Sequence, residues 1–404
     1  MRITFYIARA TVCVLLATAA YWSLRLAWAD HLFRSDQPGN IQRAAQLVPF
    51  HALYQARAGN LHRAVELNPY LSSAWLELAH NAEATADFRE AERCLLRAAA
   101  VDHQFEPRWA LANFYFRRSN PQQFWHWIRL AAERSYGDRS AIYRICWRMT
   151  EDPAKILANA IPRDPTLLAD YLQFLTADNR LDAAMNALPL VLRHATPDQQ
   201  NVFMALCERL LSAGRGPDAA TVWNGVIGRG WLPYRTLDPG SSAWLTNAAL
   251  EVSPLGKGFD WRLLWRAGVT SAWIPTMRQL RIELTGKQAE ETEIVRQFVP
   301  SVPAGRYVFR YRYRTEGFPQ RSGVRWQVRD LAQPIHTAVA SGELFSPDWK
   351  TGELAFPVPQ PAGLIEIVLL YRRSPGTSRA EGSVWFEHGF DLQTLRPEVA
   401  RTSQ

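Results

Sequence analysis

Apolar residues recur at two different periods along this chain, and the period changes near residue 228. In the first part they return every three or four positions, which places them on one face of a helix. Two such stripes consist of Trp75, Leu78, Ala79 and Ala82, and of Ala91, Leu95 and Ala98. The polar segment 85–88 lies between the stripes and suits a tight turn. The pattern therefore predicts two helices joined as a hairpin.

The first stripe starts again at Trp109, which follows Trp75 by 34 residues. A period of about 20 to 50 residues is the signature of stacked repeats. A large residue, Leu, small residues and the Ala–Leu–Ala stripe on this frame resemble the tetratricopeptide repeat. The resemblance implies a solenoid of about four or five helical hairpins over residues 30–227, with the clearest unit beginning near Ser72. An irregular helical array is the alternative.

In a solenoid of this kind the first helix of each hairpin lines the concave surface. The resemblance therefore implies that this surface binds a protein partner. The polar residues placed to contact it are His80, Asn81, Asn113 and Arg117.

The N-terminal segment 1–29 predicts a membrane anchor. Arg2 and Arg9 precede an uncharged run of 15 residues, 10–24, after which Arg25 and two tryptophans follow. Because basic residues flank the cytoplasmic end of a span, we expect a single-pass inner-membrane helix with the bulk of the chain periplasmic. The run is short, so a cleaved signal peptide ending near residue 19 or 29 is the competing interpretation, and a buried core helix is the third.

Beyond a Gly-, Pro- and Ser-rich linker at 228–257, apolar and polar residues alternate. The segments 306–314 and 323–330 show this most clearly, each with aromatic or aliphatic residues on one face and arginines on the other. Such alternation predicts half-buried strands. With the other apolar segments between Pro/Gly turns, they predict an antiparallel β-sandwich of about eight strands over residues 258–396, followed by a tail, 397–404.

The order of these strand and turn patterns resembles the jelly-roll carbohydrate-binding modules. The resemblance implies sugar binding as a hypothesis, because fold alone does not determine function. It also implies a structural calcium between the first and last strands, for which the acids Asp260, Glu387 and Asp391 are the candidates. No other cofactor is expected.

A sugar site needs flat aromatic rings beside polar side chains, so it is expected on the polar face of the sheet. Trp326 alternates in phase with Val324 and Val328 and is assigned to the core, whereas Trp385 alternates out of phase with its apolar neighbours. The residues predicted to form a basic platform for an acidic polysaccharide are Trp385, Arg310, Arg312, Arg325 and Arg329. The alternative is a solvated face whose arginines pair with acids across the strands.

The composition restricts the possible partners but does not indicate a binding or catalytic site. The chain of 404 residues has 46 basic and 38 acidic residues, a net charge of +8 that is spread along its length. The four cysteines show no paired spacing and are expected in the core. Nucleic acid is not an expected partner of an exported protein.

Motifs of the common hydrolase and nucleotide-binding families are not found in the sequence. The sequence therefore predicts a non-catalytic, membrane-anchored scaffold that is accessory to cell-surface or exopolysaccharide assembly or export. A glycan-active enzyme with a catalytic sandwich is one alternative, and a purely structural protein-interaction module is the other.

Overall fold

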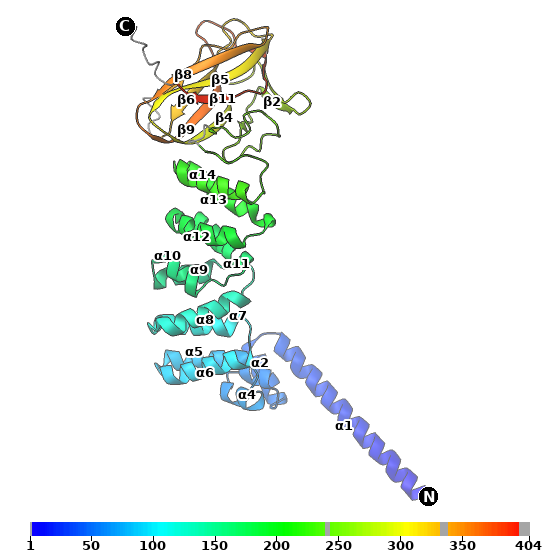
Figure 1. Cartoon of the computed structure of the whole chain (residues 1–404). Helices are drawn as coiled ribbons and strands as arrows, with labels where there is room; N and C mark the ends of the chain where they lie inside the picture. The colour runs from blue at the N-terminus through cyan, green and yellow to red at the C-terminus, as the bar shows by residue number, and fades with distance from the viewer. Residues whose placement is uncertain (1, 239–242, 332–337, 396–404) are drawn as a thin grey trace, which may run out of the picture. The chain divides into compact units, whose positions relative to one another are not determined.

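The computed structural model describes residues 2–238, 243–331 and 338–395, so the predicted tail 397–404 lies outside the described residues. The chain forms two compact units, Met1–Pro162 and Arg163–Gln404. The first unit is helical. The described residues of the second form four further α-helices and a β-sandwich (Figure 1). The predicted order, a helical part followed by antiparallel sheets, is confirmed.

The first unit contains ten helices among its described residues. They are α1 (Arg2–Arg34), α2 (Pro38–Leu47), α3 (Ala52–Arg57), α4 (Leu61–Leu67), α5 (Ser72–Ala84), α6 (Phe88–Val101), α7 (Phe105–Arg117), α8 (Pro121–Arg134), α9 (Ser140–Met149) and α10 (Pro153–Asn159). Several begin at an acid or amide that caps the free backbone N–H groups, as Asp87 does by accepting from the N–H of Glu90. The predicted stripes of α5 and α6 are all buried.

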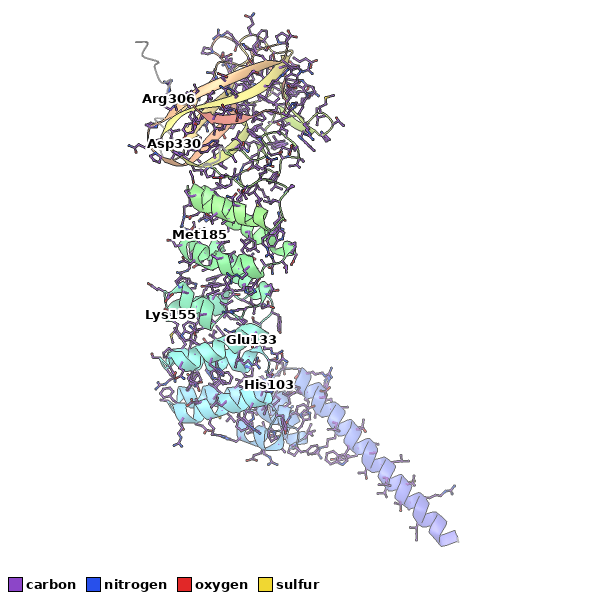
Figure 2. All side chains as sticks on the ribbon, viewed as in Figure 1. His103, Glu133, Lys155, Met185, Arg306 and Asp330 are labelled. Carbon is purple, nitrogen blue, oxygen red and sulfur yellow. The ribbon has the colours of Figure 1, made fainter. Side chains whose placement is uncertain are left out.

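Helix α1 extends far beyond the helices that cover its C-terminal end (Figures 1 and 2). Ala29 and Leu32 near that end are buried against α2 and α3. The segment Arg9–Arg34 is long and apolar enough to cross a membrane, a property that a signal sequence shares. Cys13 is exposed on this helix, so the expectation of four core cysteines is wrong for Cys13, whereas the other three are buried.

Among the described residues, five helical hairpins have the same turn. In each, one residue adopts a positive φ, and the next N–H donates to the carbonyl five residues back, as in a Schellman motif. The positive-φ residues are Gly59, Ala86, Ser119, Asn179 and Gly214, in the hairpins α3–α4, α5–α6, α7–α8, α11–α12 and α13–α14. The hairpins are therefore repeats of one backbone design.

The turns also correct the spacing of the two hairpins from which the repeat was predicted. From Ala86 to Ser119 is 33 residues, not the predicted 34. On that interval buried Leu78 corresponds to buried Leu111, and Trp75 corresponds to Arg108. Trp109 lies one position out of register and is only half-buried. The predicted length was wrong because Trp75 and Trp109 were taken as equivalent positions. Two similar side chains do not show how many residues lie in the turns between them.

The second unit begins with α11 (Pro165–Ala177), α12 (Leu181–His194), a 3₁₀ turn (Pro197–Gln199), α13 (Gln200–Ser212) and α14 (Gly216–Gly228). The last hairpin packs directly on the sandwich. Trp223 of α14 is fully buried against Phe259, with ring centroids 6.0 Å apart. Glu208 of α13 accepts two hydrogen bonds from the Arg262 guanidinium at 2.8 and 2.9 Å. These contacts join the hairpin to the first strand.

The sandwich contains the strands β1 (Arg262–Leu263), β2 (Val269–Ile274), β3 (Gln279–Thr285), β4 (Glu291–Val302), β5 (Gly305–Glu316), β6 (Val324–Asp330), β7 (Val339–Ala340), β8 (Lys350–Val358), β9 (Ala362–Arg372), β10 (Glu381–Phe386) and β11 (Asp391–Thr394). One sheet has the order β1-β4-β9-β6-β7. The other has the order β11-β5-β10-β3-β2, with β8 paired to β5. Successive strands mostly alternate between the sheets, which is the jelly-roll arrangement.

One large core fills the space between the two sheets. Phe309, Tyr311 and Tyr313 of β5 point into it, and the first two rings contact Trp326 of β6, which is fully buried as predicted. We call the opposite side of each sheet its outer face. Figure 2 gives two landmarks at one end of the sandwich, Arg306 of β5 and Asp330 of β6.

Candidate functional site

Trp385 lies on the outer face of the sheet that contains β5, β10 and β3. Its neighbours Val384 and Phe386 are buried in the core, so the alternation of β10 turns the indole outward, as predicted. Antiparallel pairing places Arg314 of β5 on one side of Trp385 and Arg281 of β3 on the other. The two guanidinium carbons lie 5.0 and 5.2 Å from the ring centroid, within the range of cation–π contacts.

A second tryptophan extends this arrangement. Trp349 directly precedes β8 and continues its register with β5. Its ring lies 5.6 Å from the Arg314 guanidinium carbon and 6.0 Å from that of Arg312. The side chains Trp349, Arg314, Trp385 and Arg281 thus alternate across four strands, and we call them the Trp–Arg row. With strands about 4.8 Å apart, the row spans about 14 Å.

Of this row, only Trp385 was predicted from the sequence. Arg314 was available from the same alternation that gave Arg310 and Arg312, but its position next to two tryptophans depends on strand pairing. Arg281 lies in an alternating segment, between buried Leu280 and Ile282, whereas Trp349 lies just before its strand. Their membership follows from register, which a single sequence does not specify.

The arginines of this face differ in how they are neutralised. Arg310 pairs with Glu353 and Arg312 with Glu387, each at 2.7 Å. Arg281 lies 3.1 Å from Glu283. Within the described part of the chain, no carboxylate lies within salt-bridge distance of Arg314, which is half-buried between its two indoles. The row therefore contains one cation without an anionic partner among these residues.

The prediction that five residues share one platform is wrong in part. Arg325 and Arg329 belong to β6, which lies in the other sheet, so they face away from Trp385. Arg325 contacts Glu343 at 3.1 Å, and Arg329 contacts Glu293. The reason is topological: alternation along a strand distinguishes its two faces, but consecutive strands of a jelly roll enter opposite sheets.

The three candidate calcium ligands do not converge. Asp260 is completely buried and accepts hydrogen bonds from the Tyr234 hydroxyl at 2.7 Å and from the N–H groups of Leu255 and Trp261 at 2.6 and 2.8 Å. Burial raises the pKa of this carboxyl, and the hydrogen bonds oppose that shift. Glu387 pairs with Arg312 instead.

The third candidate ligand, Asp391, lies opposite Arg310 where β11 pairs with β5. No cluster of three His, Cys, Asp or Glu side chains that could hold a metal occurs in residues 2–238, 243–331 and 338–395. Asp260 serves the fold there, because it ties the linker to the start of the sandwich.

The candidate partner-binding residues of the first unit have different surroundings. His80 and Asn81 are exposed on α5. Asn113 is half-buried, and its side-chain amide donates to the carbonyl of Trp109 at 2.8 Å. Arg117 forms a two-pronged ion pair with Glu83, which joins α7 to α5. His80, Asn81 and Arg117 are exposed, and of these three only Arg117 forms an ion pair with the fold.

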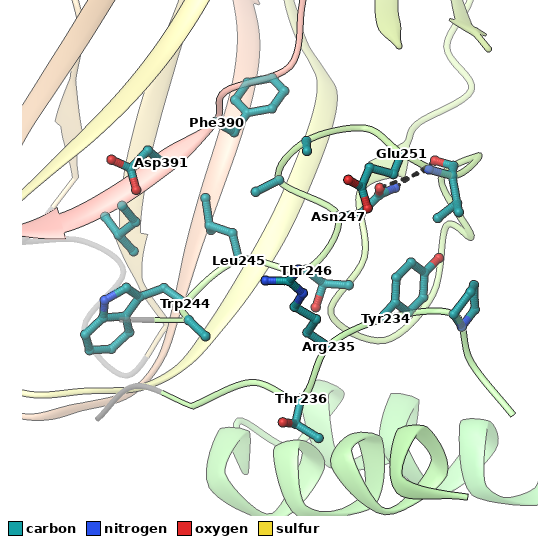
Figure 3. A pocket seen from close by; sticks show the side chains of 16 residues that line it. Tyr234, Arg235, Thr236, Trp244, Leu245, Thr246, Asn247, Glu251, Phe390 and Asp391 are labelled. Atoms are coloured by element: carbon teal, nitrogen blue, oxygen red, sulfur yellow. Dashed lines mark hydrogen bonds between the residues drawn. The ribbon is translucent and has the colours of Figure 1, made fainter. Parts of the chain in front are cut away.

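A pocket of about 510 Å³ lies between the linker and β11 (Figure 3). Arg235, Glu251 and Asp391 bring charges of both signs to its lining. Among the described residues, the buried Thr246 hydroxyl and Trp244 indole N–H in this lining have no hydrogen-bond partner. No sequence pattern indicates this pocket, because it forms where an irregular segment folds back on the sandwich.

No protein-family model and no curated protein sequence matches the chain. The chain is similar to several solved structures over about a third of its length. A family 4 carbohydrate-binding module is 11% identical over 33% of this chain and 88% of that one, with a TM-score of 0.24. A family 61 module in complex with β-1,4-galactotriose is 18% identical over 33% and 88%, with a TM-score of 0.23.

An arabinose-bound family 51 α-L-arabinofuranosidase is 13% identical over 37% of this chain and 26% of that one, with a TM-score of 0.28. At this level of similarity, what those proteins bind or cleave does not transfer to this chain.

Proposed function

We propose that this chain is a non-catalytic, membrane-anchored protein whose sandwich binds an acidic polysaccharide through the Trp–Arg row. The observation that carries the proposal is the position of Arg314, which lies between Trp349 and Trp385 and has no carboxylate partner among the described residues. An arginine of this kind can take a ligand carboxylate or sulfate with paired N–H groups. The adjacent indoles offer apolar surface to sugar rings.

The neighbouring charges support a binding face rather than a catalytic one. The acids near the row are paired with arginines: Glu353 and Glu387 each form an ion pair with an arginine of β5 at 2.7 Å, and Glu283 lies 3.1 Å from Arg281. A catalytic pair needs one carboxyl with a raised pKa and a second that remains ionised and available. We therefore propose binding without turnover, and keep glycan cleavage as the alternative that the experiment tests.

The helical parts complete the proposal. Helix α1 anchors the chain in the inner membrane, and the arginines at its N-terminal end favour a periplasmic location for the rest. The exposed side chains of His80 and Asn81 on α5 are the proposed contacts for a protein partner. This combination suits a tetratricopeptide-like scaffold that holds a polysaccharide near its assembly or export machinery.

The test is calorimetric titration of the full-length protein in detergent with a polyuronate oligosaccharide and with neutral dextran fragments. We expect binding of the polyuronate only, weakened by added salt because the contact is ionic. Arg314→Gln should weaken it about tenfold or more, since a hydrogen bond to a charged group contributes about 1.5–3 kcal/mol. Trp385→Ala should have a similar effect.

The matched control is Arg372→Gln, which removes the same charge from an exposed arginine at the end of β9 in the other sheet. This variant should bind as the wild type does. An equal loss of polyuronate affinity in both arginine variants would mean that binding depends on net charge and not on Arg314. Cleavage of the polyuronate that disappears in Glu387→Gln would favour the enzymatic alternative.

A further inference from the structure

An exposed aromatic cluster lies at the C-terminal end of the uncharged run of α1. Phe50, in the turn between α2 and α3, is 54% exposed, yet its ring lies 5.7 Å from that of Trp22 on α1. Leu53, at the start of α3, is also exposed. The ring of Tyr21 lies 5.8 Å from that of Trp22. We call the four exposed side chains the aromatic foot: Tyr21, Trp22, Phe50 and Leu53.

The aromatic foot continues the apolar surface of α1. Exposed Val12, Val14, Leu15 and Leu16 precede it on the same helix. The uncharged run of 15 residues between Arg9 and Arg25 is about 22 Å long as a helix, less than the roughly 30 Å of a hydrocarbon core. Trp22 lies less than one turn before Arg25. An element in contact with Trp22 is therefore at the depth where the acyl chains give way to headgroups.

Arg25 fixes the foot to the anchor helix. Its Nε donates to the carbonyl of Leu47, the last residue of α2, at 2.7 Å, and its Nη1 donates to the Tyr21 hydroxyl at 2.9 Å. Its guanidinium carbon also lies 5.1 Å from the Trp22 ring. The cation thus meets the negative end of the α2 dipole. Because protein groups accept some of its hydrogen bonds, the free-energy cost of placing Arg25 at a membrane boundary is lower than for an arginine without such partners.

We infer that the aromatic foot is a second membrane contact, in which Phe50 and Leu53 insert into the interfacial layer of the bilayer that α1 spans. Trp and Tyr side chains, here Trp22 and Tyr21, favour this layer. The contact lengthens the apolar surface where α1 alone is short, and it sets the angle between the anchor helix and the first hairpins. The inference rests on the anchor proposed above.

The test places a nitroxide label at one position at a time in the full-length protein, reconstituted in bilayers of phosphatidylethanolamine and phosphatidylglycerol. Cys13→Ser provides the background, since the other three cysteines are buried. Labels at Phe50→Cys and Leu53→Cys are compared with two references, Leu16→Cys on α1 and Tyr70→Cys, which is 75% exposed in the α4–α5 turn. The readout is the ratio of collisions with oxygen to collisions with a water-soluble nickel chelate.

We expect the ratios at positions 50 and 53 to lie several-fold above that at position 70 and to approach that at position 16. If position 16 is in lipid while positions 50 and 53 match position 70, the inferred membrane contact of the aromatic foot is wrong, whereas the proposed membrane anchor is supported. If position 16 also faces water, both proposals fail. Labels at 50 and 53 that are shielded from both reagents would mean that protein covers the foot, which also overturns the inference.

Discussion

A single carboxylate, Glu343, joins three segments of the sandwich. It accepts hydrogen bonds from the Ser374 hydroxyl at 2.6 Å, the Gly323 N–H at 2.9 Å and the Arg325 guanidinium at 3.1 Å. Burial alone would raise the pKa of Glu343, but these hydrogen bonds and the charge of Arg325 hold it below its ordinary value. The ionised form is therefore the one that stabilises the fold.

We predict that Glu343→Gln lowers the free energy of unfolding by about 2 kcal/mol at neutral pH. Because the folded pKa is lowered, this contribution is present above the unfolded value of about 4.3 and disappears as the pH falls below it. Urea unfolding of the wild type and the variant should therefore give curves that converge in acid. Glu353→Gln, which removes a more exposed partner, should change stability by less than about 1 kcal/mol. A gap that stays constant with pH would contradict the assignment.

Individual residues also show what the sequence can predict. The outward direction of Trp385 and the burial of Trp326 followed from alternation alone, because each depends only on neighbours within one strand. The separation of Arg325 from Arg312 did not, because it depends on which sheet each strand joins. Asp260 was misassigned for a related reason: its hydrogen-bond donors come from residues that only the folded linker brings near.

At the scale of elements, the five equivalent turns make a prediction about Ala86. This residue has a φ of 60°, in the left-handed region that costs a residue with a Cβ about 1 kcal/mol or more. Two of the other four turns have glycine in this position, Gly59 and Gly214. Ala86→Gly should therefore stabilise the first unit by about 1 kcal/mol, measured by thermal or urea unfolding of the full chain.

The control for this substitution is Ala100→Gly on the exposed face of α6. There the backbone is helical, so the added freedom of glycine should destabilise the protein by about 0.5–1 kcal/mol. Two substitutions of the same chemistry should thus have opposite signs. If both destabilise, the φ of Ala86 does not carry the strain that is assigned to it.

The positions and buried residues of the helices were predicted better than the repeat length of the hairpins. The stripes of α5 and α6 gave the correct elements and the correct buried residues, because a helical period is a local property. The repeat length of 34 was one residue too long for the next hairpin, since the turn residues Ala86 and Ser119 carry no glycine signal. Turn geometry at non-glycine positions is set by the packing of the helices that it connects.

At the scale of the whole molecule, the last hairpin and the sandwich of the second unit form one packed body. The close approach is clearest at Gly216, the first residue of α14, where an added Cβ would lie 2.1 Å from the carbonyl oxygen of Gly363. Gly258 shows the same constraint against the ring of Trp223. The linker between α14 and β1 therefore connects parts that already touch, which its Gly- and Pro-rich composition did not indicate.

This packing predicts that Gly216→Ala loosens the hairpin from the sandwich. Backbone must move to accept the methyl group, at a cost of about 3 kcal/mol. Hydrogen-exchange mass spectrometry of the full chain should show faster exchange in α13, α14 and the start of β9. Gly228→Ala is the matched control, because an added Cβ at that end of α14 meets nothing within 4 Å. It should leave exchange unchanged or slow it, since alanine favours the helix. If Gly216→Ala leaves exchange in β9 as it is in the wild type, the hairpin and the sandwich are independent bodies, and the ion pair between Glu208 and Arg262 is a surface contact that adds little to their union.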